Sequence, residues 1–123
     1  MKTVMIVDDS PTILMSMEAI LTRAGYGVAK AESGEAALRV LQGGTRPSLV
    51  ITDLNMHAMN GIELIRSLRQ LPATRFTPIL MLTTESALDK RQEARSAGAT
   101  GWIVKPVQPT DLIAVVKQMV PGA

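Results

Sequence analysis

The stretch MIVDDSP, residues 5–11, places two carboxylates, Asp8 and Asp9, directly after a short apolar run. An almost continuously apolar run of this length predicts a strand that is covered on both faces. Ser10 before Pro11 is typical of an N-cap followed by the first residue of a helix. Two adjacent carboxylates repel each other and lose hydration beside a core, so their position requires a compensating partner.

The composition is that of a single globular domain. The chain has 123 residues, of which 46% are hydrophobic and 20% are charged, and this balance excludes a disordered chain. It contains no Cys, which excludes disulfides and thiolate metal sites. No apolar run approaches the ~20 residues of a membrane helix, and the start is unlike a signal peptide. We therefore expect a cytoplasmic protein that does not associate with a membrane.

The net charge of +2 is weak evidence for a nucleic-acid partner. Lys and Arg are scattered, with one local group at Lys90, Arg91 and Arg95. The chain has one Trp, one Tyr and one Phe that could stack on bases. We expect these charges to form a solvated surface and no nucleic acid to bind.

Short apolar runs alternate with amphipathic segments along the chain. We predict strands over residues 4–7, 26–31, 49–52, 79–82 and 102–104, with the mixed run 26–31 at an edge and the other four covered on both faces. We predict helices that begin at Pro11, Ser33, Asn60, Ser86 and Pro109. The helix over 86–97 has mainly Ala and Leu88 on its apolar side, so it should be the most weakly held. The alternation predicts an α/β fold, a single doubly wound five-stranded parallel sheet flanked by five helices.

Polar residues follow four of the predicted strands. Asp8 and Asp9 follow the first, Asp53 the third, Thr83 the fourth and Lys105 the fifth. The carboxyl ends of the strands meet at one edge of such a sheet, so these residues should line a single crevice. Singly, each has an ordinary structural explanation, such as a helix cap for Asp9 or a solvated charge for Lys105. Their combination at successive strand ends favours a functional site.

Three carboxylates at one place favour a Mg²⁺ site. Oxygen ligands suit Mg²⁺, whereas softer metals prefer Cys or His, and we expect the only His, His57, to be an exposed loop residue and not a ligand. A bound Mg²⁺ offsets the repulsion between the carboxylates and supports phosphoryl transfer to one of them. Asp53 is the best nucleophile candidate because it ends a central buried strand. Thr83 and Lys105 could neutralise the phosphoryl oxygens.

Four motifs at these strand ends carry a family resemblance: IVDDS at 6–10, ITDLNM at 51–56 with NG at 60–61, MLTTE at 81–85 and GWIVKP at 101–106. On these motifs the chain resembles the receiver domain of two-component response regulators over essentially its full length, residues 1–123. It is similar in particular to the stand-alone, CheY-like chemotaxis form. The resemblance implies a flavodoxin-like sheet with the strand order 2-1-3-4-5.

The resemblance also implies that Asp53 accepts a phosphoryl group from the phosphohistidine of a histidine kinase. Mg²⁺ would be held by Asp8, Asp9, Asp53 and the backbone carbonyl of Asn55. Asn55 and Glu85 would tune the lifetime of the phosphoryl group, and this pair matches fast-cycling chemotaxis regulators.

A switch is implied by the same resemblance. Thr83 and Lys105 would contact the phosphoryl group, and Thr83 would move toward it while Trp102 turns inward. The face made by the fourth helix, the fifth strand and the fifth helix would then change shape and bind an output partner. The peptide bond between Lys105 and Pro106 is cis in the family.

Three residues depart from the family pattern. His57 stands where a proline is usual, which should loosen the loop after Asp53. Val107 replaces a phenylalanine and leaves a smaller apolar plug. Trp102 replaces the commoner tyrosine or phenylalanine, and its bulk could bias the equilibrium between the inward and outward positions.

The leading hypothesis is a signalling switch, not an enzyme, whose output is binding. In chemotaxis the donor would be a CheA-like kinase and the target a flagellar-motor switch protein, with a phosphatase as a further partner; we expect a monomer. The alternative is a phosphorelay shuttle that passes the phosphoryl group to a histidine phosphotransfer domain. A Mg²⁺-dependent phosphatase is disfavoured because Asn55 stands where those enzymes carry a second Asp. DNA binding is not expected, since nothing after Ala123 could enter a groove.

Overall fold

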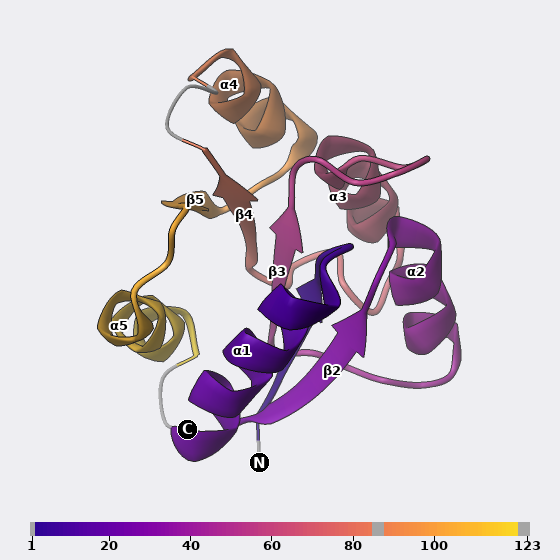
Figure 1. Cartoon of the computed structure of the whole chain (residues 1–123). Coiled ribbons are helices and arrows are strands. Elements are labelled where there is room, and N and C mark those ends of the chain that lie inside the picture. Colours follow the sequence, from indigo (N-terminus) through magenta and orange to yellow (C-terminus); the bar gives the residue numbers. More distant parts are fainter. Residues whose placement is uncertain (1, 85–87, 121–123) are drawn as a thin grey trace.

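The computed structural model of the chain describes residues 2–84 and 88–120. Strands and helices alternate strictly along these residues (Figure 1). The strands are β1 Thr3–Val7, β2 Gly27–Ala31, β3 Leu49–Asp53, β4 Ile79–Thr83 and β5 Gly101–Val104. The helices are α1 Pro11–Arg23, α2 Gly34–Gln42, α3 Gly61–Gln70, α4 Leu88–Ala97 and α5 Pro109–Met119. The all-parallel sheet in the order β2-β1-β3-β4-β5 confirms the predicted doubly wound fold.

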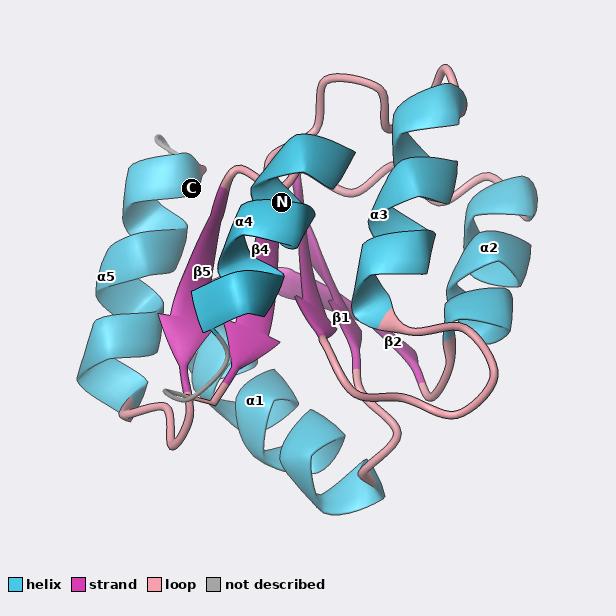
Figure 2. Cartoon of the chain, turned by 90° about the horizontal axis from the view of Figure 1, so that it is seen from above, coloured by secondary structure: helices cyan, strands magenta, loops and turns pink. Residues whose placement is uncertain are grey.

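Helices cover both faces of the sheet. α1 and α5 lie on one face, and α2, α3 and α4 lie on the other (Figure 2). Within β1, Val4 and Ile6 join the core under α1 and α5, whereas Met5 and Val7 join the opposite core, as the period of two along a strand requires. None of the described helices is long and apolar enough to span a membrane.

The central strands are the most buried part of the sheet. Every residue of β3 and β4 is buried, and β2 is only partly buried, which agrees with its predicted edge position. The expectation that 102–104 is covered on both faces is wrong, because Ile103 is the buried residue of β5 and its neighbours are half-buried. β5 is the second edge strand, with a neighbour on one side only.

Side-chain caps set the starts of the first three helices, as predicted. The hydroxyls of Ser10 and Ser33 accept hydrogen bonds from backbone amides three residues later, at 3.3 and 3.0 Å. Asn60 and Glu63 form both halves of a capping box at 2.9 Å each. These caps satisfy amide groups that have no partner within the helix.

α4 is held by little apolar surface. The predicted start at Ser86 and the side chain of Leu88 lie outside the residues and side chains that the structure describes. Among the described side chains of α4, Ala94 is the buried one. This thin contact agrees with the expectation that the fourth helix is weakly held, which suits an element that moves.

Arg69, at the end of α3, ties two turns to the helix. Its Nη1 atom donates hydrogen bonds to the carbonyls of Thr74, Arg75 and Thr77 at 3.0, 3.0 and 2.7 Å. Its Nε and Nη2 atoms donate to the carbonyl of Gly98, after α4, at 3.0 and 2.8 Å. Burial lowers the pKa of Arg69. Sequence periodicity does not predict these hydrogen bonds of Arg69, because their acceptors are backbone carbonyl oxygens.

Candidate functional site

The predicted site residues meet at the carboxyl ends of the strands. Asp8 follows β1, Asp53 and Thr83 are the last residues of β3 and β4, and Lys105 follows β5. Oxygen atoms of Asp8, Asp9 and Asp53 all lie within 4.8 Å of one another. The sheet therefore gathers these residues as predicted, although Asp53 and Thr83 belong to their strands and do not follow them.

The Asp53 carboxylate is buried and held in position. Its side chain is 7% exposed. Its Oδ1 atom accepts hydrogen bonds from the amide of Leu54 at 3.0 Å and from Nζ of Lys105 at 2.8 Å. Lys105 reaches it because its own amide donates to the carbonyl of Thr83 at 2.8 Å, which extends the pairing of β4 with β5. Asp53 is thus a fixed carboxylate beside a cation.

Asp8 is the most buried carboxylate of the cluster. Its side chain is 1% exposed, and its Oδ1 atom accepts a hydrogen bond from the amide of Ser10 at 2.9 Å. Oδ2 lies 3.6 Å from Nζ of Lys105 and accepts no hydrogen bond in the part of the chain that the structure describes. Burial raises the pKa of Asp8, and the charges of Asp53 and Asp9 add to this effect, against the lowering by the Ser10 amide and Lys105.

The Lys105 ammonium is held in its charged form. Burial alone would lower the pKa of Lys105, but the hydrogen bond to Asp53 and the charges of Asp53 and Asp8 outweigh burial and raise it. One ammonium faces two buried carboxylates, with the partly exposed Asp9 beside them. Negative charge is therefore in excess in the cluster.

This arrangement fits a hard divalent cation. The donors are carboxylate oxygens at suitable separations, and the buried Oδ2 atom of Asp8 lacks a hydrogen-bond donor among the described residues. Ca²⁺ and Mg²⁺ prefer such oxygen ligands, and Mg²⁺ keeps positions for water and phosphate. Asp9, with a side chain 33% exposed, leaves the cluster open to solvent.

We predict that Asp8→Asn stabilises the metal-free protein at neutral pH. Because the pKa of Asp8 is raised on folding, the folded state binds more protons than the unfolded state above the ordinary value of 3.8. Stability therefore falls as pH rises from 3.8 through the raised pKa, and the penalty remains at pH 7. Asp8→Asn removes the cost of burying a charged carboxylate and should raise the free energy of unfolding by about 1–2 kcal/mol. Urea unfolding in EDTA measures this change, and the difference should shrink below pH 4.

The same urea unfolding of the wild type and Asp8→Asn should also be measured with added Mg²⁺. Mg²⁺ should stabilise the wild type more than Asp8→Asn, because the variant lacks one of the three clustered carboxylates. An Asp8→Asn protein that is less stable than the wild type in EDTA would contradict the burial argument.

Thr83 and Trp102 line the side of the site toward α4. Thr83 is buried, and its hydroxyl donates to the carbonyl of Thr84 at 3.2 Å. The Trp102 ring is half-buried, with the guanidinium groups of Arg91 and Arg95 at 5.2 and 5.0 Å from its centroid. Both arginines are within the range of cation–π attraction, so α4 holds the ring from outside.

The structure says less about two residues to which the family resemblance assigns a role. Asn55 is exposed in the loop after β3, and the ligand role of its carbonyl stays a prediction. Glu85 lies outside the described residues. The peptide bond between Lys105 and Pro106 is cis, as the resemblance implied.

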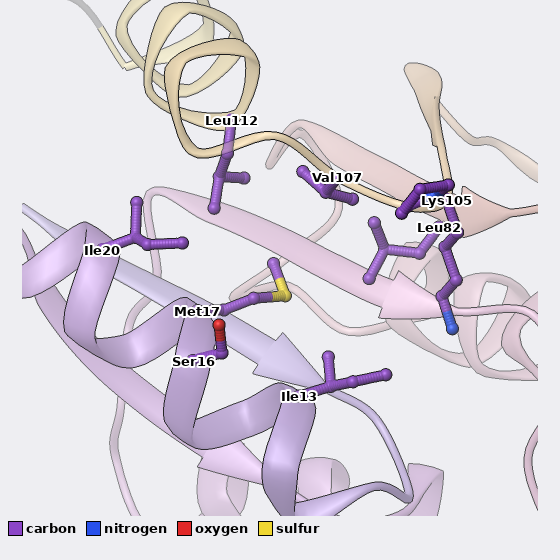
Figure 3. A pocket seen from close by; sticks show the side chains of 9 residues that line it. Ile13, Ser16, Met17, Ile20, Leu82, Lys105, Val107 and Leu112 are labelled. Carbon is purple, nitrogen blue, oxygen red and sulfur yellow. The ribbon is translucent and has the colours of Figure 1, made fainter.

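A mainly apolar pocket of about 400 Å³, partly open to solvent, lies between α1, the end of β4 and the start of α5, and Lys105 is one of its lining residues. Figure 3 shows Ile13 and Met17 on one side of it and Leu82, Val107 and Leu112 on the other. Val107 is half-buried at its wall. A side chain larger than valine therefore has room here, which agrees with the expected smaller plug.

We predict that Val107→Phe stabilises the protein by about 0.5–1.5 kcal/mol, because the ring would cover apolar side chains of this pocket that solvent now reaches. Val107→Ala is the matched control and should lower stability, since it enlarges the cavity. Urea unfolding of the two variants measures both changes. A loss of stability in Val107→Phe would show that the cavity walls cannot accept the ring.

Comparisons with known proteins agree with this geometry. The family described as the response regulator receiver domain matches residues 4–117. The chemotaxis protein CheY of Pseudomonas aeruginosa is 38% identical over 104 residues, which are 84% of this chain and 83% of that protein. The structure of CheY4 from Vibrio cholerae has a TM-score of 0.92 and 41% identity, over 98% of this chain and 99% of that chain.

Longer regulators are also similar to the chain. The transcriptional regulatory protein PrrA of Mycobacterium tuberculosis is 34% identical over 116 residues, which are 94% of this chain and 48% of that protein. The chain thus spans about half the length of this relative. Receiver domains are signalling switches of two-component systems. With the family matched over residues 4–117 and its acidic cluster in place, the chain belongs to the response regulator receiver domains.

Proposed function

We propose that the chain is a phosphorylation-dependent switch of a chemotaxis system, in which Asp53 takes a phosphoryl group from a CheA-like histidine kinase. One observation carries the proposal: the buried Asp53 carboxylate lies 2.8 Å from the Lys105 ammonium and belongs to the cluster of three carboxylates. The similarity to CheY proteins is what favours chemotaxis as the setting.

Oδ2 of Asp53 is the attacking atom in this proposal, because Oδ1 already accepts hydrogen bonds from Leu54 and Lys105. The new bond joins this oxygen to phosphorus, the P–N bond of the phosphohistidine breaks, and its electron pair returns to the donor imidazole. The Lys105 ammonium moves from Oδ1 to a phosphoryl oxygen. The Thr83 hydroxyl, at the end of the neighbouring strand, turns from the Thr84 carbonyl to another phosphoryl oxygen.

Asp8, Asp9, Asp53 and the backbone carbonyl of Asn55 are the proposed ligands of Mg²⁺, which when bound neutralises the carboxylates and the phosphoryl oxygens. The negative excess of the cluster supports this assignment. The same excess would repel an incoming phosphoryl group without such a cation.

The output side of the switch involves Trp102 and α4. Trp102 lies on β5, two strands from Asp53 in the order β3-β4-β5. The gap lined by Thr83, Ala94 and Trp102 has no room for a water molecule. An inward turn of the ring therefore requires α4 to shift, and the shift changes the surface formed by α4, β5 and α5. We propose that a flagellar-motor switch protein or another output partner binds this surface.

The remaining parts of the proposal concern the chain as a whole. We propose that residues 1–123 act as one receiver domain, as a monomer in the cytoplasm, with no enzymatic turnover of other substrates. Asn55 and Glu85 would set the phosphoryl lifetime, and a phosphatase would shorten it.

Trp102 is the only Trp in the chain, so its fluorescence can follow the switch. The test adds Mg²⁺ and then acetyl phosphate to the full chain, and records fluorescence and intact mass together. We expect the mass of one phosphoryl group, a fluorescence change, and the loss of both in EDTA. Absence of uptake would overturn the proposed acceptor, and uptake without a fluorescence change would overturn the role of Trp102.

The lifetime after donor removal separates two roles. Rapid loss of the phosphoryl group is expected for a chemotaxis regulator. A long-lived phosphoprotein that passes its phosphoryl group to a histidine phosphotransfer domain would favour the relay shuttle instead.

A further inference from the structure

Two arginines of α4 lie over the ring of Trp102. The guanidinium carbons of Arg91 and Arg95 are 5.2 and 5.0 Å from the ring centroid, within the range of cation–π attraction. The two arginines are four positions apart in the helix, so they lie on one face of it, about one turn apart. Because Trp102 belongs to β5, these contacts join α4 to the edge strand of the sheet.

The two guanidinium groups contact the ring and no acid. Neither Arg91 nor Arg95 forms an ion pair with another described residue. Glu93, which lies between them on α4, pairs instead with Lys90 and Arg66, at 3.5 and 3.9 Å. Like charges four residues apart in a helix repel each other. The electron-rich face of the ring is therefore the favourable partner that offsets this repulsion.

Arg91 is also partly removed from solvent. Its Nε atom is buried and donates no hydrogen bond to any part of the chain that the structure describes. The expected solvated surface around Lys90, Arg91 and Arg95 thus does not extend to this atom. Loss of hydration strengthens a cation–π contact, so the contact between Arg91 and Trp102 is more than a chance meeting of two surface side chains.

Little else holds the middle of α4. Among its described side chains, Ala94 is the buried one. The ion pair between α4 and Arg66 is exposed, and such pairs contribute little to stability. The C-terminal end is held more firmly, by the two hydrogen bonds from Arg69 to the carbonyl of Gly98. The contacts with the Trp102 ring are therefore a substantial part of what fixes the helix before that end.

We propose that Arg91 and Arg95 form a clamp on Trp102 that holds the switch in its unphosphorylated form. This inference rests on the proposed function, in which phosphorylation of Asp53 turns the ring inward. The gap lined by Thr83 and Trp102 has no room for a water molecule, so the ring turns inward only if α4 shifts. As it turns, the ring leaves both guanidinium groups and their attraction is lost. The two arginines are positioning residues, which act on the site through the ring and set the population of the switched form.

Loss of one arm of the clamp should speed phosphoryl uptake. In the switched form Thr83 faces the phosphoryl oxygens, so uptake should follow the population of this form. Arg91→Gln and Arg95→Gln should each raise the uptake rate from acetyl phosphate about 2–5-fold, the factor that corresponds to one cation–π contact. Intact mass of the full chain, followed over time in excess Mg²⁺, measures this rate.

A general effect of charge has the opposite sign. Fewer cations attract the anionic donor less, so the loss of a charge alone should slow uptake. Arg66→Gln is the matched control, because it removes a positive charge that contacts α4 through Glu93 and does not lie over the ring. Its uptake rate should equal that of the wild type or be lower. An acceleration in Arg66→Gln equal to that in Arg91→Gln would overturn the clamp.

Trp102, the only Trp, reports on the clamp before any phosphoryl group is added. In the unphosphorylated protein, Arg91→Gln and Arg95→Gln should change the emission spectrum of Trp102, and Arg66→Gln should not. Arg95→Lys keeps a cation without the planar guanidinium group, so its spectrum and uptake rate should lie between those of the wild type and Arg95→Gln. An emission spectrum that none of these substitutions changes would contradict the contact.

Trp102→Leu tests whether the arginines act through the ring. In this background Arg91→Gln has no ring to release, so it should change the uptake rate less than about 1.5-fold. The same acceleration with and without the ring, or no acceleration in either Gln variant, would overturn the proposal. Urea unfolding of each variant identifies those that are folded, and a purely structural role of the arginines would lower stability without faster uptake.

Failure of this inference and failure of the proposed function give different results. Mg²⁺-dependent uptake at one rate in the wild type and in both Gln variants refutes the clamp alone. Absence of uptake in the wild type refutes the proposed acceptor and, with it, the switch that the clamp would hold. Faster uptake that requires the Trp102 ring supports both.

Discussion

Asp53→Asn is expected to abolish phosphoryl uptake while the fold stays intact. An amide oxygen has the same position as the carboxylate oxygen but is not a nucleophile at neutral pH, so no aspartyl phosphate can form. The amide can still accept the hydrogen bonds from Leu54 and Lys105 that now reach Oδ1. It also removes one of three neighbouring negative charges. Burial is the main cause of the raised pKa of Asp8, and the charge of Asp53 adds to it, so the variant relieves part of this cost. We expect the free energy of unfolding to stay within about 1 kcal/mol of the wild type.

Intact mass after treatment with acetyl phosphate and Mg²⁺ measures this loss. Asp111→Asn is the matched control: it makes the same chemical change at an exposed position in the first turn of α5 and should take up phosphate like the wild type. Uptake by Asp53→Asn at the wild-type rate would show that another residue is the acceptor. Asp8 and Asp9 are then the next candidates, because they share the cluster.

The fold was predictable because its signals are local and agree with one another. Apolar runs located the strands, and Ser10, Ser33 and Asn60 marked helix starts that the hydrogen bonds confirm. The error at β5 has a different origin. Three apolar residues do not indicate whether a strand has one neighbour or two, so an edge strand that is half-buried looks like a central strand.

The site was predictable as a set of residues but not as a set of distances. Because the carboxyl ends of parallel strands lie at one edge of a sheet, the sequence alone predicts that Asp8, Asp53 and Lys105 lie close together. The sequence could not indicate that one oxygen of Asp8 is buried without a hydrogen-bond donor among the described residues, or that Arg91 and Arg95 lie over Trp102. These features depend on side-chain directions from separate elements.

The effect of a substitution at Gly61, the first residue of α3, also cannot be predicted from the sequence, here because it depends on neighbouring backbone atoms. It lies against the backbone of Asp53, the proposed phosphoryl acceptor, and its amide donates to the carbonyl of Leu54 at 2.9 Å. It does not adopt a positive φ, so helix propensity alone would predict that alanine stabilises this position. The structure predicts the opposite effect on stability, because a Cβ atom at Gly61 would clash with the Asp53 carbonyl oxygen and lie 3.0 Å from Sδ of Met81.

We therefore predict that Gly61→Ala destabilises the protein by about 2–4 kcal/mol, since a backbone oxygen cannot move aside without shifting the end of β3. Asp53 would move with it, so phosphoryl uptake by the folded variant should also slow. Gly43→Ala is the matched control, because its Cβ atom would meet nothing closer than 3.4 Å and its φ is −76°. That variant should be neutral or stabilising by up to about 1 kcal/mol. Urea unfolding decides between the two signs, and equal stability of the variants would show that β3 can yield at Asp53 without loss.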